Sequence, residues 1–437
     1  MQPCHNNPER CLRTFMPLLR LSALLFALML PGLLSAAGIV RKPIKHKPRP
    51  PAPPALVVTH APGDAEATAR DFSAWLDAAA ESNQVSGLAA AIVKGDKVLL
   101  QRGVGYADAS RSLPVTTDTV FRLASLSKAF ASALAAKLVD DGMLSWDTHV
   151  AGVLPSFELK NVAASEKLTV RDILSQRVGL PHNTYDGLLE QDEPYQTLVE
   201  RLKEVPLACE VGDCYAYQNI TFALIGDITY AVSGDFFYHQ VEKRLFHPLG
   251  MTTATYGKDA LESSASWARP HAHRGRSWVP FETKEAYYHV PAAAGVNASI
   301  KDMTKWLIAQ MGNRPDVLSP SMLKTLHEAE IDTPTERRAS PWRRARLRNA
   351  QYALGWRVYD YAGETLVFHA GAVRGYRAII GFFPKYQFGA VMMWNCESPL
   401  PMGLLPMVMD RYLGLPQVNW AGVEPGDGDA ALTGGSR

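Results

Sequence analysis

Ser125-Leu126-Ser127-Lys128 is the stretch that decides how this 437-residue sequence is interpreted. It opens a segment whose apolar residues recur at helical spacing, which predicts a helix from Ser125 to Asp141 that ends before Gly142. A serine three residues before a lysine lies on the same face of the first helical turn. The amine can then hydrogen-bond the hydroxyl, and the helix N-terminus stabilises negative charge there. The four residues therefore predict an activated serine nucleophile that needs no histidine.

The same spacing occurs a second time, at Ser321-Met322-Leu323-Lys324. About one Ser-x-x-Lys is expected by chance in a chain of this length, so the pattern alone has little weight. The second copy follows Ser319-Pro320, which is typical of the capped start of a surface helix. We therefore assign the nucleophile to Ser125 and a structural role to Ser321.

Two further polar motifs follow along the chain. Tyr217-Gln218-Asn219 lies in the predominantly helical middle, and His369-Ala370-Gly371 lies among residues that favour a strand. Alone, the first motif is most often a turn or a helix cap, and the second a strand end. Judged together and in this order, they indicate one common site.

The three motifs together resemble those of the penicillin-recognising serine hydrolases: class C β-lactamases, DD-peptidases and the related family VIII esterases. Ser125 to Lys128 matches their Ser-x-x-Lys, Tyr217 to Asn219 matches their Tyr-x-Asn, and His369 to Gly371 occupies their Lys-Thr-Gly position. The resemblance covers roughly residues 65 to 415. It implies a β-lactamase/transpeptidase-like fold, in which an α/β part is combined with an all-α part.

The resemblance also implies how acyl transfer would proceed. Ser125 would form the acyl-enzyme, with Lys128 and Tyr217 as alternative bases that the sequence does not separate. The oxyanion hole would consist of the backbone N–H groups of Ser125 and Ala372.

The substrate would be bound by the second and third motifs. By resemblance, Asn219 hydrogen-bonds the substrate amide, and His369 and Gly371 lie beside the substrate on a strand. Because histidine is largely neutral at pH 7, whereas the family's lysine is charged, esters and amides without a carboxylate are admitted as substrates. Arg374 could supply the missing charge, and Asn395 matches an asparagine that some relatives place near the substrate.

The sequence thus predicts an exported serine hydrolase without a cofactor, whose substrate is a β-lactam, a D-alanyl peptide or an ester. The alternative is a catalytically idle module that binds penicillin or peptidoglycan, and the intact polar residues at all three motifs argue against it. A metallohydrolase is disfavoured, because the only paired histidines, His271 and His273, are expected in a loop.

Strand-like runs cluster at the two ends of the chain, and helical patterns lie between them. Residues 87–93 and 97–103 predict a hairpin, and short runs rich in Val, Ile, Tyr and Phe return after Tyr352. This order predicts one antiparallel sheet built from both termini, with an inserted helical domain. A last helix over residues 402–413 is expected to cover the sheet.

The catalytic domain is predicted at residues 64–415, with a disordered tail at 416–437. Residues 1–37 carry arginines before an uncharged apolar run, which indicates a signal peptide or, alternatively, a membrane anchor. Residues 38–63 are rich in Pro and Lys/Arg, which predicts a stiff tether able to contact the cell envelope. We expect an exported protein, in the periplasm.

Charge is distributed unevenly along the chain. Of its 45 Lys/Arg and 43 Asp/Glu residues, residues 1–60 hold eight and one respectively, which leaves a net charge of −5 for the remainder. An acidic domain excludes a nucleic-acid partner and leaves a small-molecule or peptide substrate, while the oligomeric state is not predicted. Residues 337–348 hold six arginines and predict either a solvated loop or an anion-binding one.

Cysteines are few. Cys209 and Cys214 stand five residues apart just before Tyr217, and either form a disulfide in an oxidising compartment or stay reduced. Cys396 is predicted to be unpaired and buried.

Overall fold

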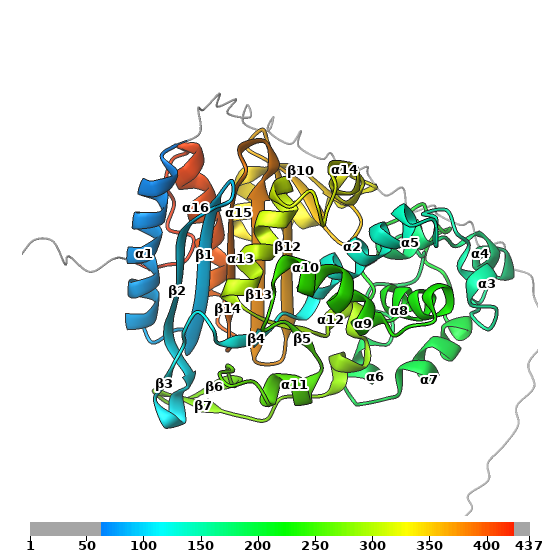
Figure 1. Cartoon of the computed structure of the whole chain (residues 1–437), viewed down its shortest axis with the longest axis horizontal. Helices are drawn as coiled ribbons and strands as arrows, with labels where there is room; N and C mark the ends of the chain where they lie inside the picture. Colours follow the sequence, from blue (N-terminus) through cyan, green and yellow to red (C-terminus); the bar gives the residue numbers. More distant parts are fainter. Residues whose placement is uncertain (1–62, 424–437) are drawn as a thin grey trace, which may run out of the picture. The chain divides into compact units, whose positions relative to one another are not determined.

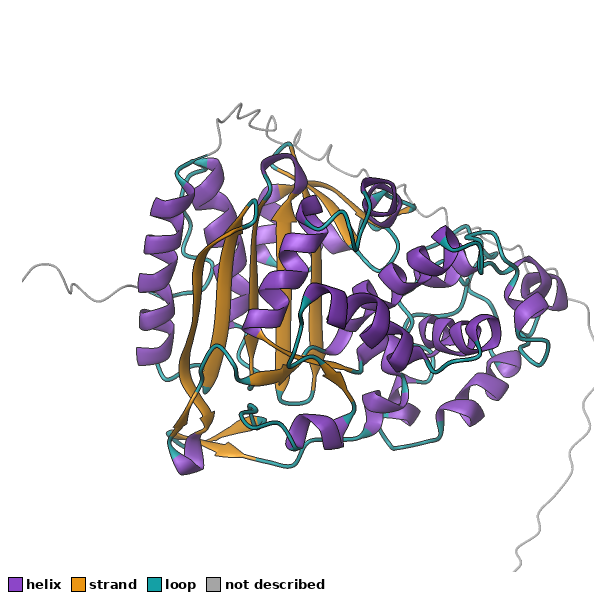
Figure 2. Cartoon of the chain, in the orientation of Figure 1, coloured by secondary structure: helices purple, strands orange, loops and turns teal. Residues whose placement is uncertain are grey.

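The computed structural model describes residues 63–423; the predicted leader, the tether up to residue 62 and the last residues of the predicted tail lie outside the described residues. A nine-stranded sheet forms the centre of the domain (Figures 1 and 2). Strands β1 (Gly87–Lys94) and β14 (Phe388–Trp394) pair antiparallel in its middle. The predicted sheet built from both termini is therefore confirmed. The remaining strands extend it on both sides, in the order β3 (Leu113–Pro114), β2 (Lys97–Asp108), β1, β14, β13 (Tyr376–Phe383), β12 (Glu364–Val373), β11 (Arg357–Tyr361), β10 (Leu347–Tyr352) and β9 (Ile331–Asp332).

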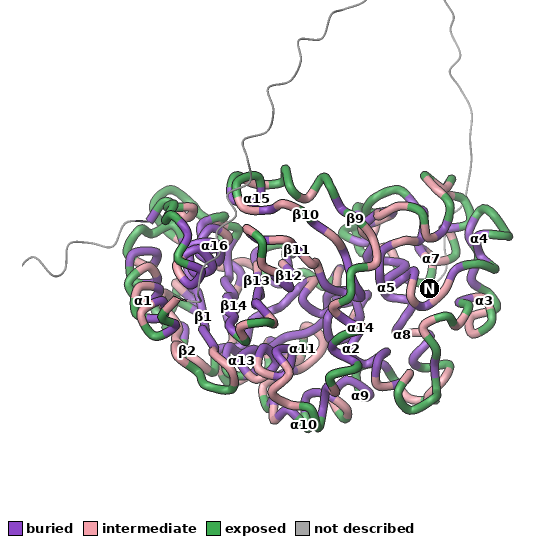
Figure 3. Tube along the Cα trace, turned by 90° about the horizontal axis from the view of Figure 1, so that it is seen from above, coloured by how far each residue is buried: buried purple, intermediate pink, exposed green. Residues whose placement is uncertain are grey.

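Helices cover both faces of this sheet. Helices α1 (Ala65–Glu81) and α16 (Leu400–Leu413) lie side by side on one face (Figure 1), and α13 (Ile300–Ile308) packs on β1 and β14 from the other. Successive side chains of a strand point to opposite faces of the sheet. Because helices cover both faces, β1 is buried along almost its whole length (Figure 3). This double burial explains why β1 is an unbroken apolar run rather than an alternating one.

The helical region is inserted between β4 (Val120–Arg122) and β8 (Val296–Ser299), which pair with each other in a small sheet with β5 (Thr255–Tyr256). The predicted helical insertion is confirmed, and it occupies the right side of Figure 2. Its helices are α2 (Ser127–Asp140), α3 (Val150–Val153), α4 (Val162–Lys167), α5 (Val170–Leu174), α6 (Asp186–Leu189), α7 (Tyr195–Glu200), α8 (Ile220–Ser233), α9 (Phe237–Val241), α10 (His247–Leu249), α11 (Lys258–Glu262) and α12 (Pro291–Ala294).

Two outcomes differ from the sequence predictions. The packed chain continues beyond residue 415: the Trp420 indole donates to Asp410 Oδ2 at 2.9 Å, and Val423 is buried. The arginine-rich segment is partly buried rather than solvated, because helix α15 (Pro341–Arg346) places Arg343 against Trp342 and in an ion pair with Glu336. The predicted tail boundary and the solvated-loop interpretation are wrong at these positions.

The sequence left open whether Cys209 and Cys214 form a disulfide or stay reduced. Cys209 and Cys214 form a disulfide with their Cα atoms 6.3 Å apart, and Cys396 is buried and unpaired. Within residues 63–423, no single helix is long and apolar enough to cross a membrane, and one bent pair, Ile220–Ser233 with Phe237–Leu249, meets the length and composition criteria only jointly.

Candidate active site

Ser125 lies in a short 3₁₀ turn, Ala124–Leu126, that leads directly into α2. The predicted helix therefore begins two residues later than expected, at Ser127. The turn is held tightly: Ala124 has a left-handed backbone (φ 51°), and Ser127 Oγ donates to the Ala124 carbonyl at 2.6 Å. A left-handed alanine is a strained conformation, of the kind that accumulates at functional sites. The turn leaves Ser125 partly exposed at the start of a buried helix.

Lys128, one turn further along α2, is fully buried. Its Nζ donates to Asn219 Oδ1 at 2.6 Å and to the Ala293 carbonyl at 3.2 Å, and lies 4.6 Å from the centre of the Tyr217 ring. Burial lowers the pKa of Lys128 to about 7, an effect that Asp186 opposes. A substantial fraction of this amine is therefore neutral at physiological pH.

Tyr217 completes the cluster from the loop before α8. Burial raises the pKa of the Tyr217 phenol, while its hydrogen bond with Ser125 acts in the opposite direction. Tyr217 thus keeps its proton at neutral pH, whereas Lys128 titrates there. The structure brings Ser125, Lys128 and Tyr217 together, and favours Lys128 as the group that finally holds the proton.

Asn219 connects this cluster to a buried carboxylate. Its Oδ1 accepts from Lys128, and its Nδ2 donates to Asp186 Oδ2 at 2.7 Å. Burial raises the pKa of Asp186, with the Asn219 hydrogen bond and the charge of Lys128 opposing that shift. Asp186 orients Asn219 and stabilises the protonated form of Lys128. The sequence analysis missed it, because no motif surrounds it.

Strand β12 borders the turn that carries Ser125. A Cβ added to Gly371 would collide with the Leu123 carbonyl oxygen and lie 3.1 Å from the Ser125 nitrogen, so only glycine permits this close approach. Strand β11 pairs with β12 only from Glu364 to Phe368. Among the described strands, the edge from residue 369 to 373 is therefore unpaired on that side, and Ala372 is exposed on it. An extended acyl donor can add to such an edge.

His369 lies on β12, buried beside Tyr352. Its Nδ1 donates to the Ala370 carbonyl at 2.9 Å, which leaves Nε2 to accept from the Tyr352 hydroxyl at 3.2 Å. Burial lowers the pKa of His369 well below its usual value, and the charges of Arg357 and Lys128 add to this effect. The imidazole is therefore neutral, and its two nitrogens are engaged by protein groups.

The permanent positive charge near the third motif belongs to Arg357, which the sequence analysis did not identify. Its guanidinium carbon lies 5.7 Å from the centre of the Tyr217 ring, and it forms an ion pair with Glu336 at 2.8 Å. Arg374 cannot serve this role, because it lies in the turn beyond the end of β12, and about 13 Å of strand separates His369 from the last strand residue, Val373.

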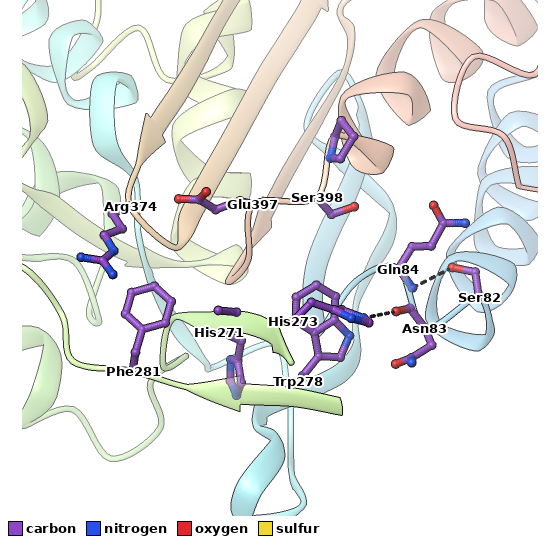
Figure 4. Close-up of a pocket in the computed structure, with 12 residues that line it drawn as sticks. Ser82, Asn83, Gln84, His271, His273, Trp278, Phe281, Arg374, Glu397 and Ser398 are labelled. Carbon is purple, nitrogen blue, oxygen red and sulfur yellow. Dashed lines mark hydrogen bonds between the residues drawn. The ribbon is translucent and has the colours of Figure 1, made fainter. Parts of the chain in front are cut away.

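Arg374 instead lines a separate cavity of about 700 Å³ at the β12–β13 turn (Figure 4). There its guanidinium carbon lies 5.1 Å from the centre of the Phe281 ring, and Trp278 and Glu397 also line the cavity. The suggestion that Arg374 replaces the family's lysine is therefore wrong.

Three other sequence candidates lie outside the cluster. Asn395 donates to the Tyr106 and Ala107 carbonyls at 3.0 and 3.2 Å, so it ties two strands together rather than facing a substrate. Ser321 is exposed on α14 (Pro320–His327), whose cap is Ser319, as predicted. His271 and His273 lie on strand β6 (His271–Arg274), so the expectation of a loop is wrong, and His271 is buried against the Ala109 amide. Within residues 63–423 no group of three His, Cys, Asp or Glu side chains could hold a metal ion.

Comparisons with known proteins bear on the family and the fold. The chain is 27% identical over 342 residues to the unguisins hydrolase ungD' of Aspergillus campestris (strain IBT 28561), covering 75% of this chain and 61% of that protein, so it spans less than two thirds of that relative's length. Its fold is similar to that of the octameric penicillin-binding protein homologue from Pyrococcus abyssi (TM-score 0.70, 22% identity, 79% of this chain and 77% of that chain).

A class C beta lactamase from Rhodobacter sphaeroides has the same fold, with a TM-score of 0.60, 22% identity and coverage of 77% of this chain and 96% of that chain. The profile of the Beta-lactamase family matches residues 72–406, a range that includes all three motifs. The resemblance drawn from these motifs is thereby confirmed at the level of family and fold: the chain belongs to the Beta-lactamase family.

Proposed function

We propose that this protein is an exported serine hydrolase that forms an acyl-enzyme on Ser125 and acts on a peptide-like amide or an ester. The observation that carries the proposal is the Lys128 amine, buried beside Tyr217 with a pKa lowered to about 7. A neutral amine at this position can accept the proton that Ser125 loses as it attacks a carbonyl. A module that only binds its ligand has no use for such an amine.

The proposed reaction has two stages. Ser125 Oγ attacks the acyl carbon, its proton passes to Lys128 with Tyr217 in contact with both groups, and the leaving group departs with that proton. The backbone N–H groups of Ser125 and Ala372 stabilise the oxyanion. Water then attacks the acyl carbon and gives a proton to Lys128, and that proton passes to Ser125 Oγ as the bond between Oγ and the acyl carbon breaks.

The charge distribution favours substrates without a carboxylate beside the scissile bond. His369 is neutral, and the Arg357 charge is already paired with Glu336. At the third motif itself a substrate carboxylate would find a neutral imidazole, and the nearby Arg357 already has a carboxylate partner in Glu336, which it shares with Arg343. One relative is named as an unguisins hydrolase, which supports a hydrolytic reaction. The unpaired edge of β12 supports an extended acyl donor.

Export is part of the proposal. The disulfide between Cys209 and Cys214 is stable in an oxidising compartment, and the apolar run before residue 40 is typical of a signal peptide. N-terminal sequencing of the protein from a periplasmic fraction tests it: a mature start close to Gly38 supports a cleaved signal, and a membrane-bound chain that retains the run supports the anchor.

Two measurements test the reaction and the substrate class. Intact mass after exposure to an activated short-chain ester and, separately, to a penicillin reveals any acyl-enzyme; no adduct with either reagent would favour the idle module. Hydrolysis of a thioester whose leaving group is thioglycolate is then compared with that of the matching thioglycolate methyl ester. We expect the uncharged substrate to have the higher kcat/KM, and a tenfold preference for the carboxylate would contradict the substrate class.

The pH dependence of acylation follows from Lys128. Because only the neutral amine accepts a proton, kcat/KM is expected to rise with pH and to level off above the Lys128 pKa, with an inflection near about 7. A rise that continues to pH 10 without levelling off would instead assign the base to Tyr217, whose pKa is raised by burial. The measurement uses an ester that does not titrate between pH 5 and 10.

Replacement of Asp186 by asparagine tests its influence on that inflection. The Asp186 charge raises the pKa of Lys128, so its removal should lower that pKa and move the rising limb of the profile to lower pH. The asparagine keeps an acceptor for the Asn219 Nδ2 group. A purely structural role for Asp186 would reduce kcat/KM without moving the inflection.

Gly371→Ala should lower kcat/KM for acylation by about one to two powers of ten, because its methyl group collides with the Leu123 carbonyl and displaces β12 from Ser125. Gly152→Ala is the matched control, since a Cβ at Gly152 meets nothing within 4 Å. Both variants are compared by ester hydrolysis and thermal unfolding. Full activity in a folded Gly371→Ala protein would mean that this close approach does not position the nucleophile.

A further inference from the structure

A second cavity, of about 520 Å³, opens on the helical region. Its lining residue Ala223 stands one helical turn beyond Asn219 on α8, but no residue of the three motifs lines the cavity. Helices α7, α8 and α9 supply most of its walls. Aromatic rings line it: Tyr195 from α7, Tyr230 from α8, and Phe236 and Tyr238 at the start of α9. None of these four aromatic residues forms a hydrogen bond, an ion pair or a ring contact with Ser125, Lys128 or Tyr217.

The aromatic rings at the mouth are unusually exposed for their type. Tyr230, Phe236 and Tyr238 are 52%, 54% and 37% exposed. They are arranged as one group, because the Phe236 ring lies 5.4 Å from that of Tyr230 and stacks on that of Tyr238 at 5.7 Å. Three adjacent rings that leave this much surface in water are poorly explained as part of the core and mark a surface that binds something.

A single carboxylate lies among these rings. Asp227, on α8, accepts a hydrogen bond from the Tyr195 hydroxyl at 2.6 Å and forms no ion pair with any described residue. Burial raises the pKa of Asp227, which means that the folded protein leaves its charge incompletely compensated. The neighbouring Asp235, by contrast, is paired with His239 at 3.2 Å and Lys243 at 3.6 Å.

Aromatic faces around one uncompensated carboxylate are the chemical complement of an organic cation. The negative faces of tyrosine and phenylalanine rings attract an ammonium group, alkylated ammonium groups above all, and a carboxylate supplies the counter-charge. A neutral apolar ligand would gain nothing from Asp227, and an anion would be repelled by it. We propose that this cavity, formed by Tyr195, Asp227, Tyr230, Phe236 and Tyr238, binds a small molecule through an ammonium group, at a site separate from Ser125.

Choline and its uncharged isostere 3,3-dimethylbutan-1-ol provide the test, because they have the same shape and differ in charge. Titration of the full-length protein by calorimetry at constant ionic strength, balanced with sodium chloride, should show saturable binding of choline. The isostere should bind at least tenfold more weakly. Equal affinities would overturn the proposal in favour of a plain apolar groove, and the absence of saturable choline binding up to about 50 mM would overturn it altogether.

Variants locate the site. Asp227→Asn keeps an acceptor for the Tyr195 hydroxyl but removes the charge, and should weaken choline binding about tenfold or more. Phe236→Ala should weaken it about threefold to tenfold, the effect expected for the loss of one ring face. The matched control is Tyr106→Ala, which removes a ring that is 45% exposed elsewhere on the domain and should leave the affinity unchanged. Unchanged affinity in Asp227→Asn, or equal losses in Phe236→Ala and Tyr106→Ala, would overturn the assignment.

Discussion

Replacement of Ser125 by alanine is expected to abolish covalent labelling by an activated ester and to lower kcat/KM by about four powers of ten or more. The reason is geometric: the strained turn at Ala124 and the close approach of Gly371 to the Ser125 backbone nitrogen position this residue, and its hydroxyl shares a hydrogen bond with Tyr217. The measurement is intact mass after incubation with the ester, followed by steady-state hydrolysis. An alanine side chain fits the partly exposed position, so the variant should fold normally.

The matched control for this experiment is Ser321→Ala. Ser321 belongs to the second Ser-x-x-Lys of the chain, but it and Lys324 are exposed on α14, and its hydroxyl lies 2.9 Å from that of Ser319. Its removal should leave labelling and hydrolysis unchanged. Undiminished labelling of the Ser125→Ala protein, or loss of labelling in the Ser321→Ala protein, would contradict the assignment of the nucleophile.

The comparison between Ser125 and Ser321 illustrates what the sequence can and cannot predict. The local spacing is the same in both, and only the order of the later motifs distinguishes them. The structure supplies the physical difference: Lys128 is buried and loses part of its proton affinity, whereas Lys324 remains in water. The fold class was predictable for a similar reason, because strand-like runs at both ends and helices between them leave few arrangements.

Asp186 and Arg357 could not be predicted in this way. Asp186 stands 33 residues from the Asn219 that it orients, in a helix of only four residues, and nothing in its neighbourhood differs from a surface carboxylate. Arg357 begins β11 and reaches Tyr217 only because β11 lies next to β12 in the sheet. Their roles depend on how separate segments pack, and packing is not encoded in a local spacing.

The assignment of charge to Arg374 failed for a related reason. Arg374 is near His369 in sequence, and the sequence alone does not show that β12 runs on from His369 to Val373 and places Arg374 in the turn beyond its end. Each residue of an extended strand adds about 3.3 Å to its length, so residues that are only a few positions apart in the sequence can lie far apart in space. Arg343 is the converse case: it belongs to a basic run that suggests solvent, but it packs on Trp342 and forms an ion pair with Glu336.

Lys128→Met and Tyr217→Phe are expected to be nearly as damaging as Ser125→Ala, and above all not to be additive. Both groups act on the one proton that leaves Ser125, so removal of either interrupts the same proton transfer. General base catalysis of this kind contributes roughly two to four powers of ten to the rate. The double variant should then be no more than a few-fold worse than the worse single variant. Acylation rates with an activated ester, measured under single-turnover conditions, provide the four values of the cycle.

Methionine matches the length of the buried lysine, and phenylalanine keeps the ring that Lys128 faces at 4.6 Å, so both substitutions preserve packing. Lys128→Met leaves the Asn219 and Ala293 oxygens without a donor, which makes thermal unfolding of each variant a necessary control. Losses that multiply in the double variant would mean that Lys128 and Tyr217 serve separate steps. In that case the pH profile of Tyr217→Phe decides between them: an inflection that stays near about 7 keeps the base at Lys128, and one that disappears moves it to the phenol.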